Sequence, residues 1–150
     1  MRVVVQRVSN ASVVVDGEEI SAIGRGLMVL VCVETGDHEA DVDWLTKKIV
    51  GLRIFEDESG VMNLDVQAVG GDILAVSQVT LVAGKRKGNR PSYIRAAAPD
   101  VAVPMYEEFC RRLESLTGRS VGRGRFGADM KVSLINDGPV TIIIDSRLRE

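Results

Sequence analysis

Polar side chains interrupt an apolar stretch in the middle of the chain, at Ser77-Gln78-Val79-Thr80. The stretch over residues 73–82 is predicted to be a buried strand. A buried hydroxyl or amide without a partner costs about 1–3 kcal/mol, so polar groups there need a reason. Either the strand emerges into solvent at this point, or the polar groups line a pocket. In the second case, hydroxyls and backbone N–H groups could meet a substrate carbonyl.

A hydroxyl in this segment is a weak candidate for a nucleophile. Ser77 or Thr80 would need an adjacent base, but the only histidine of the chain is His38 and no lysine adjoins the segment. The same lack of histidine argues against a histidine-based metal site. Cys32, in an apolar strand, and Cys110, on a helix, are expected to be reduced core residues rather than a disulfide or a metal pair.

A second chemical candidate is the pair Gly138-Pro139, which presents backbone carbonyls with little side chain around them. Because proline cannot donate a ladder hydrogen bond, a tight turn is predicted over residues 136–139. The turn would join antiparallel strands at 131–136 and 140–146. It is either a plain hairpin or a surface that recognises small groups through main-chain oxygens.

Length and composition predict one globular domain over residues 1–150. No apolar run approaches the roughly 20 residues of a membrane helix. Arg7 interrupts the N-terminal apolar run where a signal peptide would need a longer one, so we expect a cytoplasmic protein. The net charge of −2 does not indicate a nucleic-acid binder, and any such contact must come from a local patch.

Period-two and helical patterns indicate the elements that hold these groups. Valine-rich strands are expected at 2–9 and 11–16, and Leu27–Val33 reads as a strand buried on both faces. One helix should begin after Asp37 as N-cap, and a second should span Pro104–Thr117. The buried stripe of the second helix is predicted to comprise Tyr106, Phe109, Cys110, Leu113 and Leu116. The fold class is α+β: a strongly twisted, mostly antiparallel, barrel-like sheet with two main helices.

Across essentially its full length the chain resembles the D-aminoacyl-tRNA deacylase family, of the D-tyrosyl-tRNA deacylase type. The resemblance is carried by Met1–Val8, Ser77-Gln78-x-Thr80, Lys87–Pro91, Phe126-Gly127-Ala128-x-Met130 and Asn136–Thr141. One departure is Val79, where the family usually has phenylalanine, which changes the local shape of the pocket.

The resemblance implies hydrolysis of the ester that joins a D-amino acid to the terminal ribose of tRNA, without a cofactor or metal. It implies a homodimer in which a cis Gly138-Pro139 turn enters the partner's active site. The implied catalytic residues are Ser77, Gln78 and Thr80. The implied substrate-binding residues are Gly138, Pro139, Phe126, Met130 and Val79. The basic loop Lys85, Arg86, Lys87 and Arg90 is implied to contact tRNA phosphates.

We favour a mechanism without a protein nucleophile, in which the ribose 2′-hydroxyl assists and backbone N–H groups around residues 78–80 stabilise the oxyanion. Phe126 either stacks near the terminal adenine or is an ordinary core aromatic. One alternative function is a serine- or threonine-dependent esterase of small esters, with Thr80 as the nucleophile. Another is a non-catalytic RNA-binding module, although an aromatic content of only 4% argues against a stacking platform.

Overall fold

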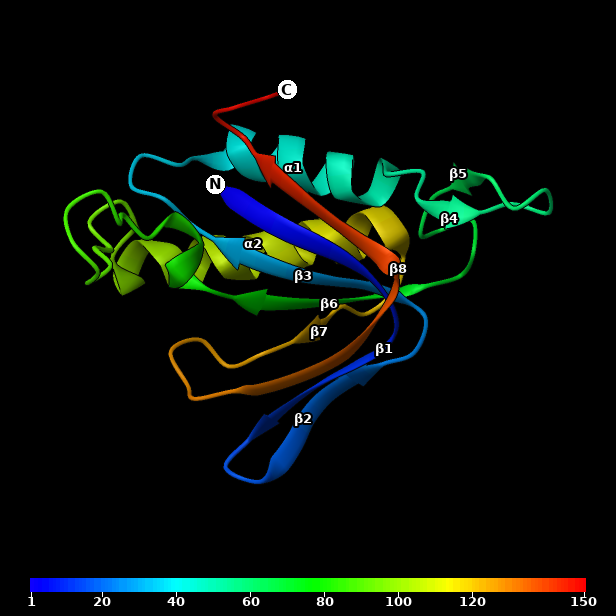
Figure 1. Cartoon of the computed structure of the whole chain (residues 1–150), viewed down its shortest axis with the longest axis horizontal. Helices are drawn as coiled ribbons and strands as arrows, with labels where there is room; N and C mark the ends of the chain where they lie inside the picture. The colour runs from blue at the N-terminus through cyan, green and yellow to red at the C-terminus, as the bar shows by residue number, and fades with distance from the viewer.

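The structure, a computed structural model, describes all residues 1–150 and is built on a six-stranded sheet with two helices (Figure 1). The sheet strands are β1 (Arg2–Val15), β2 (Glu18–Ile23), β3 (Gly26–Cys32), β6 (Asp72–Ser77), β7 (Gly122–Arg123) and β8 (Lys131–Asp145). Their order is β2-β1-β3-β6-β7, and β8 pairs with β1. Only the β3–β6 and β6–β7 pairings are parallel. The α+β class with a mostly antiparallel sheet is therefore confirmed.

The long strand β1 organises the sheet. The residues expected to form two strands make one continuous strand of 14 residues. Its first half pairs with β3 and its second half with β2, while β8 follows almost its whole length. A Cβ added at Gly122 in β7 would lie 2.5 Å from Ser21 Oγ in β2, so the two ends of the sheet approach each other. This closure gives the barrel-like shape that we expected.

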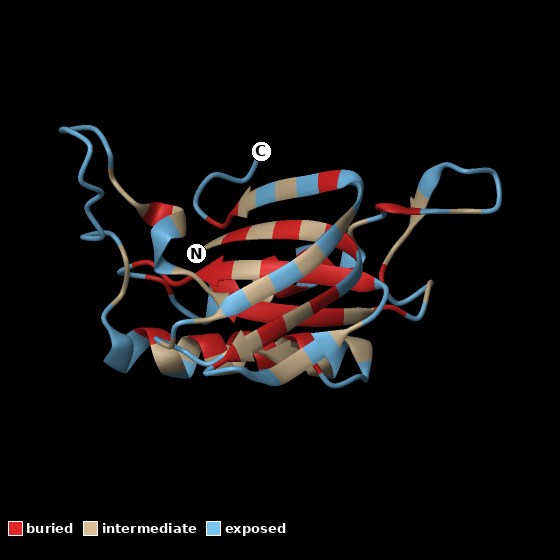
Figure 2. Ribbon diagram, turned by 60° about the horizontal axis from the view of Figure 1, so that its bottom comes forward, coloured by how far each residue is buried: buried red, intermediate tan, exposed pale blue.

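The core lies on both sides of the central strands, which are largely buried in Figure 2. The helices α1 (Glu39–Gly51) and α2 (Pro99–Thr117) pack on one face, over Leu27, Val29 and Val31. On the other face, Met28 of β3 meets side chains of β1 and β6 inside the barrel. Strand β3 is therefore buried on both faces, as predicted from its continuous apolar sequence.

Both helices begin at different residues from those predicted. The N-cap of α1 is His38, whose Nδ1 accepts a hydrogen bond from the Ala40 N–H at 3.3 Å. Asp37 is buried instead, against the N-terminal ammonium of Met1 at 2.8 Å. Helix α2 begins five residues earlier than expected, with Pro99 in its first turn. Its buried stripe ends at Leu113, because Leu116 is 37% exposed.

The predicted hairpin over residues 136–139 does not exist. Strand β8 runs through this segment as one strand beside β1. Val8 pairs with Asn136 and Gln6 pairs with Thr141, so residues 137–140 all lie opposite Arg7. These residues form a bulge, which we call the β8 bulge. The Gly138-Pro139 peptide bond within it is cis.

The remaining elements lie outside this sheet. Strands β4 (Phe55–Glu56) and β5 (Met62–Leu64) form a separate two-stranded ribbon. A 3-10 helix, η1 (Val79–Val82), follows β6 directly, so the predicted strand over 73–82 ends at Ser77. Neither helix is long and apolar enough to cross a membrane.

Candidate active site

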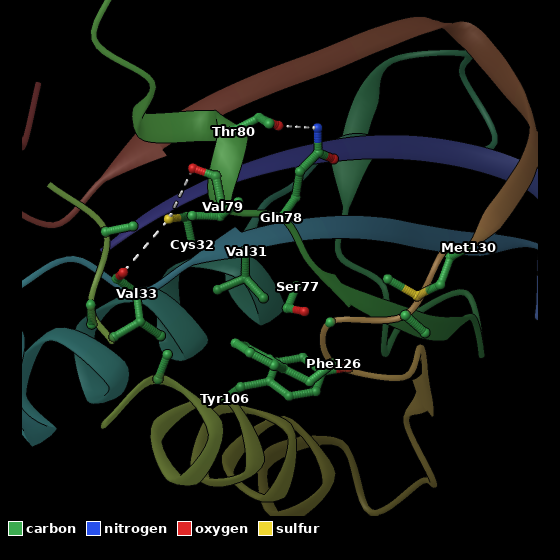
Figure 3. Close-up of a pocket in the computed structure, with 15 residues that line it drawn as sticks. Val31, Cys32, Val33, Ser77, Gln78, Val79, Thr80, Tyr106, Phe126 and Met130 are labelled. Atoms are coloured by element: carbon green, nitrogen blue, oxygen red, sulfur yellow. Dashed lines mark hydrogen bonds between the residues drawn. The ribbon is translucent and has the colours of Figure 1, made fainter. Parts of the chain in front are cut away.

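A cavity of about 340 Å³ opens where the parallel strands β3 and β6 end (Figure 3). The carboxyl ends of parallel strands are a common place for ligand sites, because the chain leaves the sheet there and opens a crevice. The lining residues are Val31, Cys32, Val33, Ser77, Gln78, Val79, Thr80, Ala96, Ala97, Ala102, Tyr106, Phe126, Gly127, Ala128 and Met130. All six residues predicted from the Ser77–Thr80 and Phe126–Met130 motifs are among them.

The polar floor of the cavity is formed where β6 turns into η1. The Gln78 N–H donates to Val31 O at 2.8 Å, which is the last backbone bond towards β3. The chain then turns, and the Leu81 N–H donates to Gln78 O at 3.3 Å to open the 3-10 helix. The N–H groups of Val79 and Thr80 precede this bond and have no partner within the helix. The 3-10 helix therefore leaves these two donors unused.

The side chains of this segment are partly ordered by each other. Gln78 Nε2 donates to Thr80 Oγ1 at 2.9 Å. Ser77 is half-buried and lies between Val31 and the ring of Phe126 in Figure 3. Val79 is 48% exposed at the mouth. The sequence presents two alternatives for this segment, a strand end that emerges into solvent or the lining of a pocket. In the structure the segment does both.

Aromatic and sulfur side chains form one wall. The rings of Tyr106 and Phe126 have centroids 6.5 Å apart at 49°, and the Tyr106 hydroxyl donates to Ala75 O at 2.6 Å. The sequence predicted Tyr106 only as a core residue of α2. Met130 Sδ accepts from the Arg125 N–H at 3.4 Å, and a Cβ at Gly124 would come within 2.6 Å of this sulfur. A side chain at 124 would therefore displace the Met130 thioether from its present position in the wall.

The opposite wall depends on a buried charged cluster that the sequence did not reveal. Glu34 is 1% exposed and accepts from Arg95 Nη2 at 2.6 Å and from the Met1 ammonium at 3.3 Å. Backbone bonds join the same segments, from the Thr35 N–H to Arg95 O and from the Ala97 N–H to Val33 O, both 2.9 Å. Glu34 thus fixes the segment that lines the cavity next to the end of β3. Its partners are far apart in the chain, so no local pattern indicates them.

The cavity holds no side chain that is an anionic base at neutral pH. Its titratable groups are Cys32 and Tyr106. Burial raises the pKa of the Cys32 thiol to about 11, helped by the nearby Glu34 carboxylate. Burial also raises the pKa of the Tyr106 phenol far above its usual range. Both groups are therefore protonated, and neither activates the Thr80 hydroxyl.

The β8 bulge lies away from this cavity in the same chain. Arg7 of β1 lies opposite the bulge on one side and pairs with Leu27 of β3 on the other. The cavity, in contrast, begins at Val31 of β3. Four residues along a strand amount to roughly 13 Å, and β8 is two strands from β3, roughly 10 Å across. Figure 1 shows the bend of β8 at the opposite end of the sheet from the tips of β3 and β6. Gly138 and Pro139 line no part of their own chain's cavity.

Two side chains hold the β8 bulge in place. Arg7, 6% exposed, donates from Nε to Asp137 O at 2.8 Å and from Nη1 to Ile54 O at 2.6 Å. Asn136 Oδ1 accepts from the Val140 N–H at 2.8 Å. The buried Val140 side chain anchors the far end in the main core. Sequence reasoning missed Arg7 and Asn136 as positioning residues, since their partners are set by the bulged register.

The basic loop lies beside the cavity rather than in its lining. Gly84 and Ser92 exchange two backbone hydrogen bonds of 2.7 Å, which close the loop at its base. Its cations are all exposed: Lys85, Arg86, Lys87 and Arg90.

Comparisons with known proteins identify the family of the chain. The family model described as "D-Tyr-tRNA(Tyr) deacylase" matches residues 4–145. Proteins named D-aminoacyl-tRNA deacylase from Bacteroides thetaiotaomicron and Flavobacterium johnsoniae are 57% and 59% identical over 150 residues, with full coverage of both chains. A solved structure named "c-Myc DNA Unwinding Element Binding Protein" superposes with a TM-score of 0.90 at 41% identity, covering 97% of this chain and 98% of that one.

A solved structure of "a probable eukaryotic D-amino acid tRNA deacylase" shares the fold, with a TM-score of 0.80 at 18% identity over 95% of this chain and 97% of the other. Together, the full-length matches and the family model show that the chain belongs to the D-Tyr-tRNA(Tyr) deacylase family.

Proposed function

We propose that this chain, as a single domain over residues 1–150, hydrolyses the ester of D-aminoacyl-tRNA in the cytoplasm and releases the D-amino acid and free tRNA. One observation carries the proposal: the Ser77–Thr80 floor and the Phe126–Met130 wall meet in one cavity of a chain that belongs to this family. The cavity has the size of a small-ligand site. It can hold an aminoacyl group and part of the terminal nucleoside, and the rest of the tRNA remains outside.

In the mechanism we propose, the protein positions the ester and stabilises the oxyanion. The N–H groups of Val79 and Thr80 are the donors for the developing negative charge. The ribose 2′-hydroxyl beside the ester assists the attacking water, which agrees with a cavity whose only titratable groups are protonated. Ser77 and Gln78 orient the substrate, while Phe126, Met130 and Val79 enclose it.

Chiral selection, in this proposal, comes from a second copy of the chain. Gly138 and Pro139 cannot reach their own cavity, so they act on the cavity of a partner subunit in a homodimer. Exposed apolar side chains on both sides of the bulge support such a contact, since Ile135 is 58% and Ile143 is 69% exposed. Two backbone carbonyls would receive the amino group of a D-amino acid. The side chain of an L-amino acid would instead meet the backbone.

The test of the activity uses one tRNA charged with each enantiomer of the same amino acid. We expect release of the D-amino acid at a rate far above spontaneous hydrolysis and little release of the L-amino acid. Equal hydrolysis of both enantiomers, or turnover of small esters with a trapped acyl-enzyme, would favour the Thr80-dependent esterase. Binding of tRNA without any hydrolysis would favour the RNA-binding module.

The partner contribution has a separate test by mixing two inactive variants. Ala96→Trp fills the cavity, and Gly138→Val distorts the bulge, because a Cβ at 138 would lie 2.7 Å from Val140 N and from Val140 Cγ2. If the bulge acts across the interface, refolding an equal mixture produces heterodimers with one intact site. Random pairing then restores about a quarter of the wild-type sites. A mixture as inactive as its components would exclude action across the interface.

A further inference from the structure

Five cations of this chain have no partner within it. Of the 19 lysines and arginines, fourteen contact a carboxylate, a backbone carbonyl or an aromatic ring. The remaining five are Lys85, Arg86, Lys87, Arg90 and Arg125, and all are exposed. Most basic side chains on this surface are thus engaged by the protein, and the free ones are confined to two short segments.

Both segments adjoin residues that line the cavity. The basic loop follows η1, which carries Thr80. Arg125 immediately precedes Phe126, which lies across the cavity from Thr80 in Figure 3. Figure 1 shows the basic loop and the loop between β7 and β8 at the same end of the molecule, where β3 and β6 end. The backbone of Arg125 is held by Met130 Sδ at 3.4 Å, while its guanidinium is free.

We propose that Arg125 and the basic loop form a two-sided phosphate-binding rim for the single-stranded 3′ end of tRNA. In this arrangement Arg125 binds the phosphate that precedes the terminal nucleoside. The inference rests on the proposed function, because it concerns the same cavity. A cavity of about 340 Å³ has room for the aminoacyl group and part of the terminal nucleoside only. The neighbouring phosphates must therefore lie at the rim, where the unpaired cations are.

Arginine suits this role because its planar guanidinium can bind a phosphate through two parallel hydrogen bonds. An anchored backbone keeps the cation beside Phe126 instead of letting it swing with a long loop. The four cations of the basic loop, on a closed but longer loop, would follow the next phosphates of the strand. The rim would thus select an ester attached to a polynucleotide over the same ester on a lone nucleoside.

The experiment compares two substrates that share one ester, D-tyrosyl-tRNA and 3′-O-D-tyrosyl-adenosine, which has no phosphate. For Arg125→Ala we expect kcat/KM on the tRNA to fall about tenfold, with the adenosine ester hydrolysed within a factor of about two of wild type. The slope of log(kcat/KM) against log[salt] should become shallower by about 0.7, the value for one phosphate contact on a single strand. Arg125→Lys should restore most of the rate on tRNA.

The matched control is Arg111→Ala, which removes the same charge from the outer face of α2, where Arg111 pairs with Glu108 at 2.8 Å. It should change neither substrate. Equal losses on both substrates for Arg125→Ala would show that Arg125 shapes the cavity, and no loss on either would show that it binds nothing. Both results overturn the proposal. Binding of uncharged tRNA, followed by anisotropy over the same salt range, tests the rim even if no deacylation is observed, so the two proposals can fail separately.

Discussion

Replacement of Arg7 by lysine tests whether the β8 bulge must be held rigidly for activity. Arg7 lies on β1 opposite the bulge, and its guanidinium joins two carbonyls from different elements, Asp137 O and Ile54 O. A lysine keeps the charge, but its single ammonium cannot reproduce the fork that reaches both oxygens. Arg7→Lys therefore removes one of the two bonds while leaving the buried charge partly satisfied.

The expected loss of stability follows from these contacts. A hydrogen bond to a charged group contributes about 1.5–3 kcal/mol. The ion pair between Arg7 and Asp137 adds little, since its atoms are 3.9 Å apart and the Asp137 side chain is 56% exposed. We therefore expect Arg7→Lys to lower the free energy of unfolding by about 2 kcal/mol, or the Tm by roughly 4–8 °C for a chain of this length. Most of the protein would remain folded.

Activity should fall much further than stability, because the ammonium cannot hold both carbonyls in the geometry that the guanidinium fixes, and one of them is Asp137 O, next to Gly138. We expect hydrolysis of D-aminoacyl-tRNA to decrease more than about tenfold, since misplacing a contacting group by 1 Å can cost about a hundredfold in rate. The matched control is Val42→Ala on α1, where removing two buried methyl groups also costs about 2 kcal/mol. Both variants are assayed at equal folded and dimeric concentration. If Arg7→Lys is as active as Val42→Ala, the bulge does not act through Arg7 and our reasoning is wrong.

Three further perturbations test other parts of the site. Thr80→Ala removes a hydroxyl that only accepts a hydrogen bond from Gln78, so we expect a rate of hydrolysis within about tenfold of wild type. Complete loss of hydrolysis in a folded variant would instead indicate that Thr80 is a nucleophile. Glu34→Gln removes the buried carboxylate that pairs with Arg95 and shares the Met1 ammonium with Asp37. It should lower the free energy of unfolding by about 3 kcal/mol in urea titrations, and an unchanged midpoint would show that the Glu34 pairs are dispensable. Burial raises the pKa of the Cys32 and Cys110 thiols from 9.0 to about 11, so the folded state holds these protons more tightly and stability should fall as the pH rises from 9 to 11. Cys110→Ala should reduce this fall, and an unchanged profile would contradict the pKa of that thiol.

The local parts of this fold could be predicted from the sequence, and the register-dependent parts could not. Continuous apolar residues predicted β3, because burial on both faces leaves no alternation. The polar residues after Val76 indicated a change of environment at the end of β6. The sequence did not predict η1, since four residues carry too little periodicity for a helix to be recognised.

The β8 bulge shows why the remainder was missed. Asn-Asp-Gly-Pro has the composition of a tight turn, and the local chemistry alone favours a hairpin. The observed strand instead continues because β1 offers a partner on both sides of the interruption, from Val8↔Asn136 to Gln6↔Thr141. Arg7 and Asn136 then satisfy the backbone groups that the ladder leaves unpaired. Such pairing depends on a strand 130 residues away, so a local pattern cannot indicate it.

The separation of the cavity and the bulge also has a consequence for how activity depends on concentration. In the arrangement we propose, the site is incomplete in one chain, because the cavity of one subunit needs the β8 bulge of the other, so the catalytic unit is the pair of subunits. Dilution below the dimer dissociation constant should then reduce kcat/KM per chain even when each monomer keeps its fold, because the two parts of the site separate. The apolar residues beside the bulge, Ile135 and Ile143, would hold the subunits together. The same contact would place the Gly138 and Pro139 carbonyls in the partner's cavity. A charged residue at Ile143 should therefore weaken association and hydrolysis in parallel, whereas a plain structural dimer would lose association alone.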